Sequence, residues 1–210
     1  VSPMAVHTIK KGLDLPITGE PEQRIYDDAP GVKTVAVLAA DYPLMKPRMH
    51  VSEGDEVKRG QILFEDRKSD NVRFTAPAAG KITAIHRGAR RALLSVVIEL
   101  SAGELSGDPG EADLRRFESY LGKDPEQLTR EQVVSLLQES GAWTALRARP
   151  YDRVPSPNDP APRGIFVTCT DSNPLAGSQE VILAECADDF ARGLRAVARL
   201  TEGTVWLNTH

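Results

Sequence analysis

One residue of this 210-residue sequence, Lys68, has a type and surroundings that could support covalent chemistry. It stands at the tip of a predicted tight turn, EDRKSD, between two segments that read as β-strands, QILFE and NVRFTA. A primary amine on an exposed hairpin can carry a covalently attached group. The other interpretation is a solvated charged turn, which keeps an exposed loop from pairing with other strands.

A second candidate site follows the apolar segment GIFVT, a predicted buried strand. Ligands of α/β proteins bind at the carboxyl ends of strands, and the next residues are CTDSNPLAG. Asp171, Ser172 and Asn173 are therefore the candidate cofactor-binding residues, although Asp-Ser-Asn-Pro is also favourable turn chemistry. No GxGxxG motif occurs in this half of the chain, and Pro174 lacks an N–H. We therefore expect this chain to bind neither a dinucleotide nor a flavin.

The remaining candidate residues are scattered. Cys169 and Cys186 stand in segments of different predicted type without a CxxC motif, so free thiols are expected. The histidines occur singly, which gives no spacing for a zinc site or for a Cys-His nucleophile. We expect no metal site and no catalytic residue. The histidines are His7, His50, His86 and His210.

Composition argues against several classes of function. A net charge of −4 does not suit a broad nucleic-acid footprint, although Arg87, Arg90 and Arg91 form a local basic turn that could meet an acidic partner. No apolar run approaches the roughly 20 residues that span a bilayer, and the start, VSPMAVHTIKKGLDLP, lacks the apolar stretch of a signal peptide. The sequence predicts a cytoplasmic globular protein.

Residues 32–104 read as an all-β unit, because short β-type runs alternate with turn residues. Many short strands and few helices favour a small barrel or sandwich. The predicted strands are VKTVAVLAA, MHV, QILFE, NVRFTA, GKITAIH and ALLSVVIEL.

Residues 105–150 read as a helical segment, entered through a Gly/Ser/Pro/Asp-rich linker at 101–110. Leu114, Phe117 and Leu121 fall on one face of a predicted helix that ends at Gly122. A second helix is predicted to begin at a capping box of Thr129 and Gln132 and to stop at Gly141. Its apolar stripe is Val133, Leu136 and Leu137.

Residues 151–210 begin an α/β domain. A proline-rich linker at 149–164 should lie extended on the surface, and a strand, one helix and the strand TVWLN then form a β-α-β unit. Phe190, Leu194 and Val197 share one face of that helix. Because two parallel strands do not make a domain, we expect a longer protein in which this domain continues; residues 1–31 form an extended N-terminal segment.

The β-rich segment resembles biotinyl and lipoyl carrier domains, through GDEVKRGQILFE and APAAGKITAI over roughly Met49 to Ile85. Carrier domains hold their lysine in Asp-Lys-Ala or Met-Lys-Met, whereas Lys68 is flanked by Arg67 and Ser69. The resemblance implies a carrier-like β barrel-sandwich with Lys68 unmodified. A covalent cofactor carrier stays open as an alternative.

Nearly the whole chain resembles the A subunit of the bacterial sodium-translocating NADH:quinone reductase. Four separated segments in the right order carry this resemblance: residues 9–21, 74–99, 140–176 and 193–203. The resemblance implies a peripheral protein on the cytoplasmic face of the inner membrane, which assembles on the membrane-embedded B subunit and is associated with ubiquinone. It also implies a second domain that is Rossmann-like and related to the flavin subunit of respiratory complex I.

In that family the complex uses NADH, ubiquinone and sodium ions, while FAD, FMN and iron-sulfur clusters lie in sister subunits. The resemblance therefore implies an oxidoreductase subunit with a structural role and no cofactor of its own. A second alternative is an electron-entry subunit like that of the Rnf complex. That alternative requires CxxCxxCxxxCP cysteine runs, which these 210 residues lack.

Overall fold

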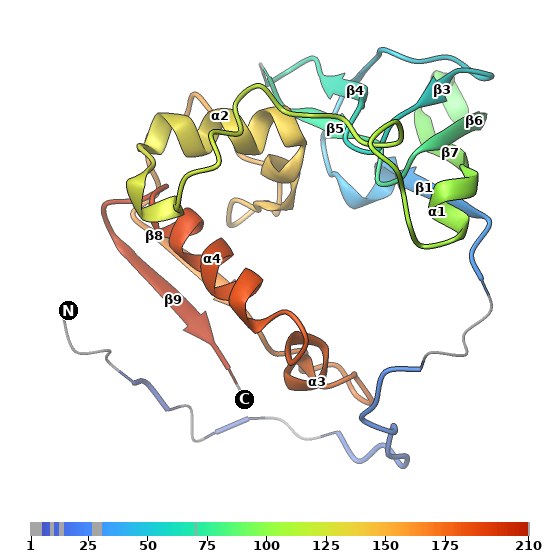
Figure 1. The fold of residues 1–210 in the computed structure, drawn as a ribbon. Coiled ribbons are helices and arrows are strands. Elements are labelled where there is room, and N and C mark those ends of the chain that lie inside the picture. Colours follow the sequence, from blue (N-terminus) through green and yellow to red (C-terminus); the bar gives the residue numbers. More distant parts are fainter. Residues whose placement is uncertain (1–5, 9–10, 13–14, 27–30, 70, 210) are drawn as a thin grey trace.

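The computed structural model describes residues 6–8, 11–12, 15–26, 31–69 and 71–209. A β-rich region and an α/β region lie on opposite sides of a helical segment (Figure 1). Residues 15–26 form no helix or strand, and Gln23 among them contacts the α/β region (Figure 1).

Two antiparallel sheets form the β-rich region, as the sequence predicts. The larger sheet has the order β1-β7-β6-β3, and the smaller one has the order β2-β4-β5. Five of the six predicted strands are present, while the sixth, MHV at residues 49–51, overlaps β2 only at Met49; β3 was missed because it is only two residues long. The strands are β1 (Thr34–Leu38), β2 (Pro47–Met49), β3 (Glu56–Val57), β4 (Ile62–Asp66), β5 (Arg73–Thr75), β6 (Gly80–Arg87) and β7 (Leu93–Leu100). Two 3₁₀ turns, η1 (Ala39–Asp41) and η2 (Ala89–Arg91), follow β1 and β6.

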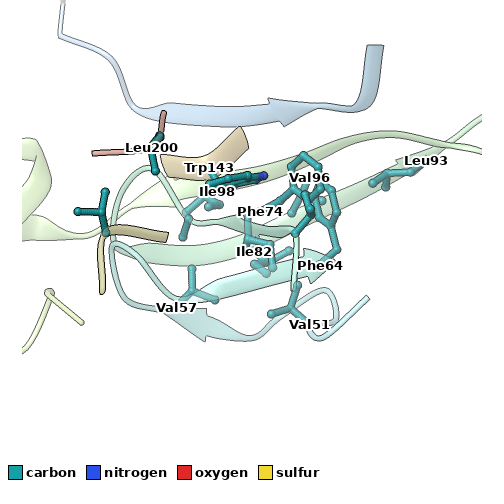
Figure 2. Close-up of a cluster of buried hydrophobic side chains, with 14 of the residues drawn as sticks. Val51, Val57, Phe64, Phe74, Ile82, Leu93, Val96, Ile98, Trp143 and Leu200 are labelled. Carbon is teal, nitrogen blue, oxygen red and sulfur yellow. The ribbon is translucent and has the colours of Figure 1, made fainter. Parts of the chain in front are cut away.

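The core of this region is apolar and tightly packed (Figure 2). Phe64 and Phe74 stack with ring centroids 4.6 Å apart, and Tyr42 meets Phe74 edge-on at the same distance. Burying each such side chain contributes roughly 1.5–3 kcal/mol. Gly80 permits the closest backbone approach, because a Cβ at its φ of +155° would lie 1.9 Å from the carbonyl oxygen of Glu99. The side chains under 2% exposed are Leu63, Phe64, Val72, Ile82, Val96, Ile98 and, in the α/β region, Leu200.

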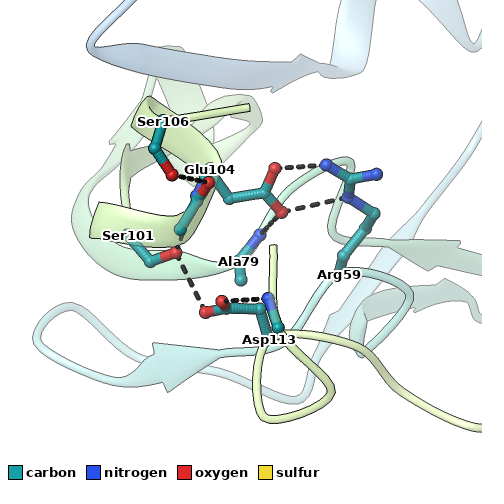
Figure 3. Close-up of polar contacts among 8 residues, drawn as sticks. Arg59, Ala79, Ser101, Glu104, Ser106 and Asp113 are labelled. Atoms are coloured by element: carbon teal, nitrogen blue, oxygen red, sulfur yellow. Dashed lines mark hydrogen bonds and ion pairs between the residues drawn. The ribbon is translucent and has the colours of Figure 1, made fainter. Parts of the chain in front are cut away.

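The predicted linker at 101–110 is instead folded onto the β-rich region (Figure 3). It contains α1 (Ala102–Leu105), and the Ser101 hydroxyl accepts from Glu104 N and donates to Asp113 Oδ1 at 2.9 Å. The Glu104 carboxylate accepts from Ala79 N at 2.8 Å and pairs with the Arg59 guanidinium. This pairing holds the pKa of the Glu104 carboxyl below its usual range. The segment predicted as a linker is therefore packed on the β-rich region, because Glu104 bonds to Arg59 and Ala79, which are far away in the sequence.

The predicted helix containing Leu114, Phe117 and Leu121 was wrong. Its first residues run beside the β-rich region, where Arg59 N donates to Asp113 O at 2.8 Å and Arg115 N donates to Arg59 O at 3.0 Å. These backbone groups are therefore unavailable for helical hydrogen bonds. The Phe117 ring lies over Gly60, 2.8 Å from where a Cβ would stand. Hydrogen bonds to the distant residue Arg59 therefore determine the structure here, and not the helical spacing of the apolar residues.

The second predicted helix is confirmed as α2 (Arg130–Ser140), with both bonds of the capping box present. Gly141 ends it in the left-handed conformation, at a φ of +81°. Two 3₁₀ turns flank α2: η3 (Pro125–Gln127) and η4 (Ala142–Ala145). Trp143, in η4, is buried and donates its ring N–H to Pro155 O at 2.8 Å. Residues 149–163 of the proline-rich linker hold no helix or named strand, as predicted, but the centre of the linker packs on Trp143 and does not lie wholly on the surface.

The predicted β-α-β unit is confirmed. Strands β8 (Gly164–Thr168) and β9 (Thr204–Asn208) pair in parallel, and the chain between them contains α3 (Gln179–Leu183) and α4 (Ala187–Ala198). The single helix predicted there is broken, because Cys186 has a non-helical backbone (φ −129°, ψ 27°) at the start of α4. Aspartates in the first turn of α4 favour this new start through the helix dipole. The predicted face of α4 is half-buried: Phe190, Leu194 and Val197.

Candidate functional site

The hairpin of Lys68 is tied to the loop before β2. Asp66 Oδ1 accepts from Lys46 N at 3.0 Å and from Lys68 N at 3.1 Å, which fixes the turn. The Lys68 amine is exposed and donates to the carbonyl oxygen of Leu44 at 3.1 Å. An enzyme that modifies Lys68 would have to detach the amine from this backbone acceptor first.

A pocket of about 380 Å³, here called the strand-end pocket, lies at the carboxyl ends of β8 and β9. Its walls come from the turn after β8, from α3 and α4, from the end of β9 and from the N-terminal segment. Its apolar floor is formed by Leu183, Phe190 and Leu207. The other lining residues are Gln23, Cys169, Thr170, Asp171, Ala176, Gly177, Ser178, Gln179, Glu180 and Thr209.

The three predicted site residues do not act together. Asp171 lines the strand-end pocket, whereas Ser172 and Asn173 do not. Asp171 Oδ1 accepts from both the backbone N (2.9 Å) and the side-chain amide (2.7 Å) of Asn173. The Asp-Ser-Asn sequence thus closes a turn on itself, which is the turn chemistry expected for these residues.

Gln23 is a site residue that no sequence pattern singles out. Its Oε1 accepts from Ser178 N at 2.6 Å and its Nε2 donates to Ala176 O at 3.5 Å, so one amide side chain bonds to both sides of the pocket loop. Gln23 and Ser178 are 155 positions apart, and the segment around Gln23 has no periodicity. Only the folded chain brings them together.

The charge of the strand-end pocket restricts its ligands. Its described lining contains the carboxylates of Asp171 and Glu180 and no lysine or arginine. A pyrophosphate would therefore be repelled. Over the described part of the chain, no group of three or more metal-ligating side chains is placed to hold an ion, and no helix is long and apolar enough to cross a membrane.

A smaller pocket of about 220 Å³, the aromatic pocket, lies between the β-rich region and η4. Tyr42 and Phe74 form its aromatic wall, and the Arg147 guanidinium lies 5.2 Å from the Tyr42 ring centroid. The hydroxyls of Thr75 and Thr144 already donate to backbone carbonyls of Ser140 and Gly141. The remaining lining residues are Ala36, Val37, Leu38, Asp41, Pro77 and Gly141.

Two family models match the chain. Residues 7–101 match the NqrA N-terminal barrel-sandwich hybrid domain, and residues 128–210 match the NqrA second alpha/beta domain. A relative from Shewanella amazonensis, named as the A subunit of Na(+)-translocating NADH-quinone reductase, is 48% identical over 95% of this chain. Relatives of the same name from Pasteurella multocida and Neisseria meningitidis serogroup B are 49% and 50% identical over 95% and 92% of it.

The chain belongs to the NqrA family. The resemblance of the four sequence segments is thereby confirmed, as are the barrel-sandwich and α/β architectures. The chain spans 43% of the Shewanella amazonensis relative and 42% and 41% of the other two.

Each of the two pockets takes lining residues from both segments that the NqrA domain models match. The strand-end pocket falls within the second alpha/beta domain except for Gln23, which belongs to the segment matched by the N-terminal model. The aromatic pocket joins the barrel-sandwich domain to residues of the second model, Gly141 and Thr144. Both pockets therefore depend on how the two domains are held against each other.

Proposed function

We propose that this chain is a peripheral component of a sodium-pumping NADH:ubiquinone oxidoreductase, on the cytoplasmic face of the bacterial inner membrane. Its role is structural: it assembles on the membrane-embedded B subunit and carries no flavin or iron-sulfur cluster. The observation that carries this proposal is the match to both NqrA domain models, together with 48% identity to a relative named as the A subunit. The two carboxylates of the strand-end pocket support the proposed lack of a bound dinucleotide.

The organisation of the chain follows from the same proposal. Residues 1–31 are an extended segment, 32–104 the carrier-like domain, 105–150 a helical segment, and 151–210 the start of a Rossmann-like domain related to the complex I flavin subunit. The parallel β8–β9 pair with its intervening helices supports the last assignment.

Assembly is tested by expressing the tagged chain with the other reductase subunits and isolating the membrane fraction. We expect the chain to co-purify with the membrane-embedded B subunit after mild cross-linking. Recovery of the chain in the soluble fraction alone would contradict a peripheral assembly role.

The intact mass of the same sample tests the carrier alternative, because a lipoyl or biotinyl addition at Lys68 would replace the structural role. Titration with NADH and FMN should show no binding in the low micromolar range; such binding would favour the electron-entry alternative.

Ubiquinone contact is a second function, favoured by the aromatic pocket. Its volume suits one flat ring, and Tyr42 and Phe74 offer aromatic contact to a quinone head group. The Tyr42 hydroxyl can donate to a quinone oxygen. We expect saturation-transfer NMR to show contact with a short-chain ubiquinone, weakened in Tyr42→Phe. An equal signal in Tyr42→Phe and in a Tyr151→Phe control, which alters an exposed tyrosine, would exclude this pocket.

A further inference from the structure

The loop between β6 and β7 concentrates positive charge in a chain of net charge −4. Arg87, Arg90 and Arg91 lie within five residues, and all three are exposed. Among the residues that the structure describes, none of the three forms an ion pair. The three guanidinium groups of this loop, here called the basic loop (residues 87–91), are therefore available to an external anion.

The backbone of the basic loop is fixed in a conformation that does not favour arginine. Arg90 and Arg91 have φ values of 54° and 60°, in the left-handed region where glycine and asparagine are preferred. Gly88 N donates to Ala92 O at 2.8 Å, and the Arg87 guanidinium donates to Arg91 O at 3.3 Å, which closes the loop. Local conformational preference does not explain these arginines, so their side chains are better explained by what they contact.

An exposed leucine accompanies the charges. Leu94 is 52% exposed, and its methyl carbons lie 3.2 and 3.5 Å from where a Cβ on Gly88 would stand. Its side chain thus lies against the backbone of the basic loop. The hairpin end combines guanidinium groups with an apolar side chain, a combination that suits the boundary between lipid headgroups and acyl chains.

We propose that the basic loop docks on an anionic phospholipid surface, with the arginines on lipid phosphates and Leu94 at the acyl boundary. The inference rests on the proposed membrane-associated role. A lipid surface fits better than an acidic protein, because a stable protein interface needs about 800 Å² from each partner, more than a five-residue hairpin end supplies. Arginine pairs with phosphate through a planar fork and needs no fixed spacing between phosphates. The contact is weak alone and effective once the chain is held near the membrane.

The test tethers the chain, through a terminal hexahistidine tag, to vesicles that contain nickel-chelating lipid. One set is phosphatidylcholine, and the other is phosphatidylcholine with about a third phosphatidylglycerol. Phenylglyoxal modification of arginines is followed by peptide mass spectrometry. We expect Arg87, Arg90 and Arg91 to react about ten-fold more slowly on the anionic vesicles, with protection lost near ~1 M salt. Three exposed arginines that form no ion pair with any described residue are internal controls and should keep their rates: Arg153, Arg163 and Arg192.

A matched pair of variants gives a second readout. We expect R87Q/R90Q/R91Q to bind the anionic vesicles about a hundred-fold more weakly than the wild type, since each of the three arginines contributes a factor of roughly five. R153Q/R163Q/R192Q should change affinity far less. Equal arginine reactivity on both vesicles would overturn the proposal, as would equal affinity of the two variants. Protection only by the other reductase subunits would assign the loop to an acidic protein and would also overturn it. The tag holds the chain at the vesicle surface without the other reductase subunits. The arginine reactivity and the vesicle affinity can therefore be interpreted even if the chain does not co-purify with the reductase.

Discussion

The β-rich region and the α/β region bury their apolar side chains very differently. Of the seventeen buried aliphatic and aromatic residues in the described part of the chain, thirteen lie between Val51 and Ile98, while Leu200 alone lies beyond residue 150. Phe64 is fully buried between two sheets, whereas Phe166, in β8, is 69% exposed. Antiparallel sheets that pack face to face bury both inner faces, while a parallel pair needs cover on each side.

The two regions therefore differ in how much their buried apolar side chains stabilise them and in how open their surfaces are. The β-rich region has more buried apolar residues, and its Arg59 pairs with Glu104 of α1. The α/β region keeps its strand ends open, with the strand-end pocket and the exposed Phe166. Trp206 stacks near Phe166 on the same face of the sheet, with centroids 6.3 Å apart, and is contacted by His7 of the N-terminal segment. The β-rich region thus holds most of the buried apolar core, while pockets lie in both regions.

The largest effect should come from truncating one phenylalanine in each region. Phe64→Ala removes a fully buried ring that stacks on Phe74, so we expect a loss of about 3–5 kcal/mol in the free energy of unfolding. Phe166→Ala removes an exposed ring and should change it by less than about 0.5 kcal/mol. Urea titrations followed by circular dichroism measure both. Similar losses in the two variants would remove the contrast between the regions.

A smaller effect should come from the buried carboxylate of the β-rich region. Glu104, whose side chain is 5% exposed, accepts from Ala79 N and pairs with Arg59, so Glu104→Gln should cost about 2 kcal/mol at neutral pH. The folded-state pKa is lowered, so this stabilisation is complete above the unfolded pKa of about 4.3 and declines as the pH falls through the folded value.

The control for Glu104 is Glu111→Gln. Glu111 also pairs with an arginine, Arg116, but its side chain is 86% exposed, so the change should be small at every pH. Stability is measured by urea titration from pH 7 downward. The wild type and Glu104→Gln should converge in the acid range. A constant difference between them down to low pH would show that Glu104 acts through packing and not through its charge.

The sequence predicted the parts of the fold that local patterns determine. Short β-type runs between turn residues indicated five of the seven strands of the β-rich region, Thr129 and Gln132 indicated the start of α2, and Gly141 indicated its end. The failures between residues 101 and 122 are non-local, whereas the break between α3 and α4 has a local cause at Cys186. Glu104 reaches Arg59 across 45 positions, and those bonds turned a predicted linker into a packed segment. The spacing of residues within a short segment cannot predict hydrogen-bond partners that are distant in the sequence.

The candidate site was predicted less well than the fold. The rule that ligands bind at strand ends pointed to Asp171, which the structure places in the lining of a pocket; its binding role stays a prediction. It could not distinguish Asp171 from Ser172 and Asn173, because a turn that bonds to itself has the same sequence as one that binds a ligand. Gln23 could not be predicted, since its partner Ser178 is 155 positions away.

The smallest effect concerns α2, which joins the two regions. At one end Thr75, in β5, donates to Ser140 O at 2.9 Å; at the other, Arg130 donates to Leu200 O at 3.3 Å. Thr129→Ala removes the cap of α2 and should cost about 1 kcal/mol, while Thr129→Ser keeps the hydroxyl and should restore most of it. Because the cap lies at the end of α2 that meets the α/β region, hydrogen exchange should rise in α2 and around Leu200. Exchange in the β-rich strands should stay near its wild-type rate. An equal rise of exchange in both regions would show that they unfold as one unit. The two regions would then have the same stability against unfolding, although they bury different numbers of apolar side chains.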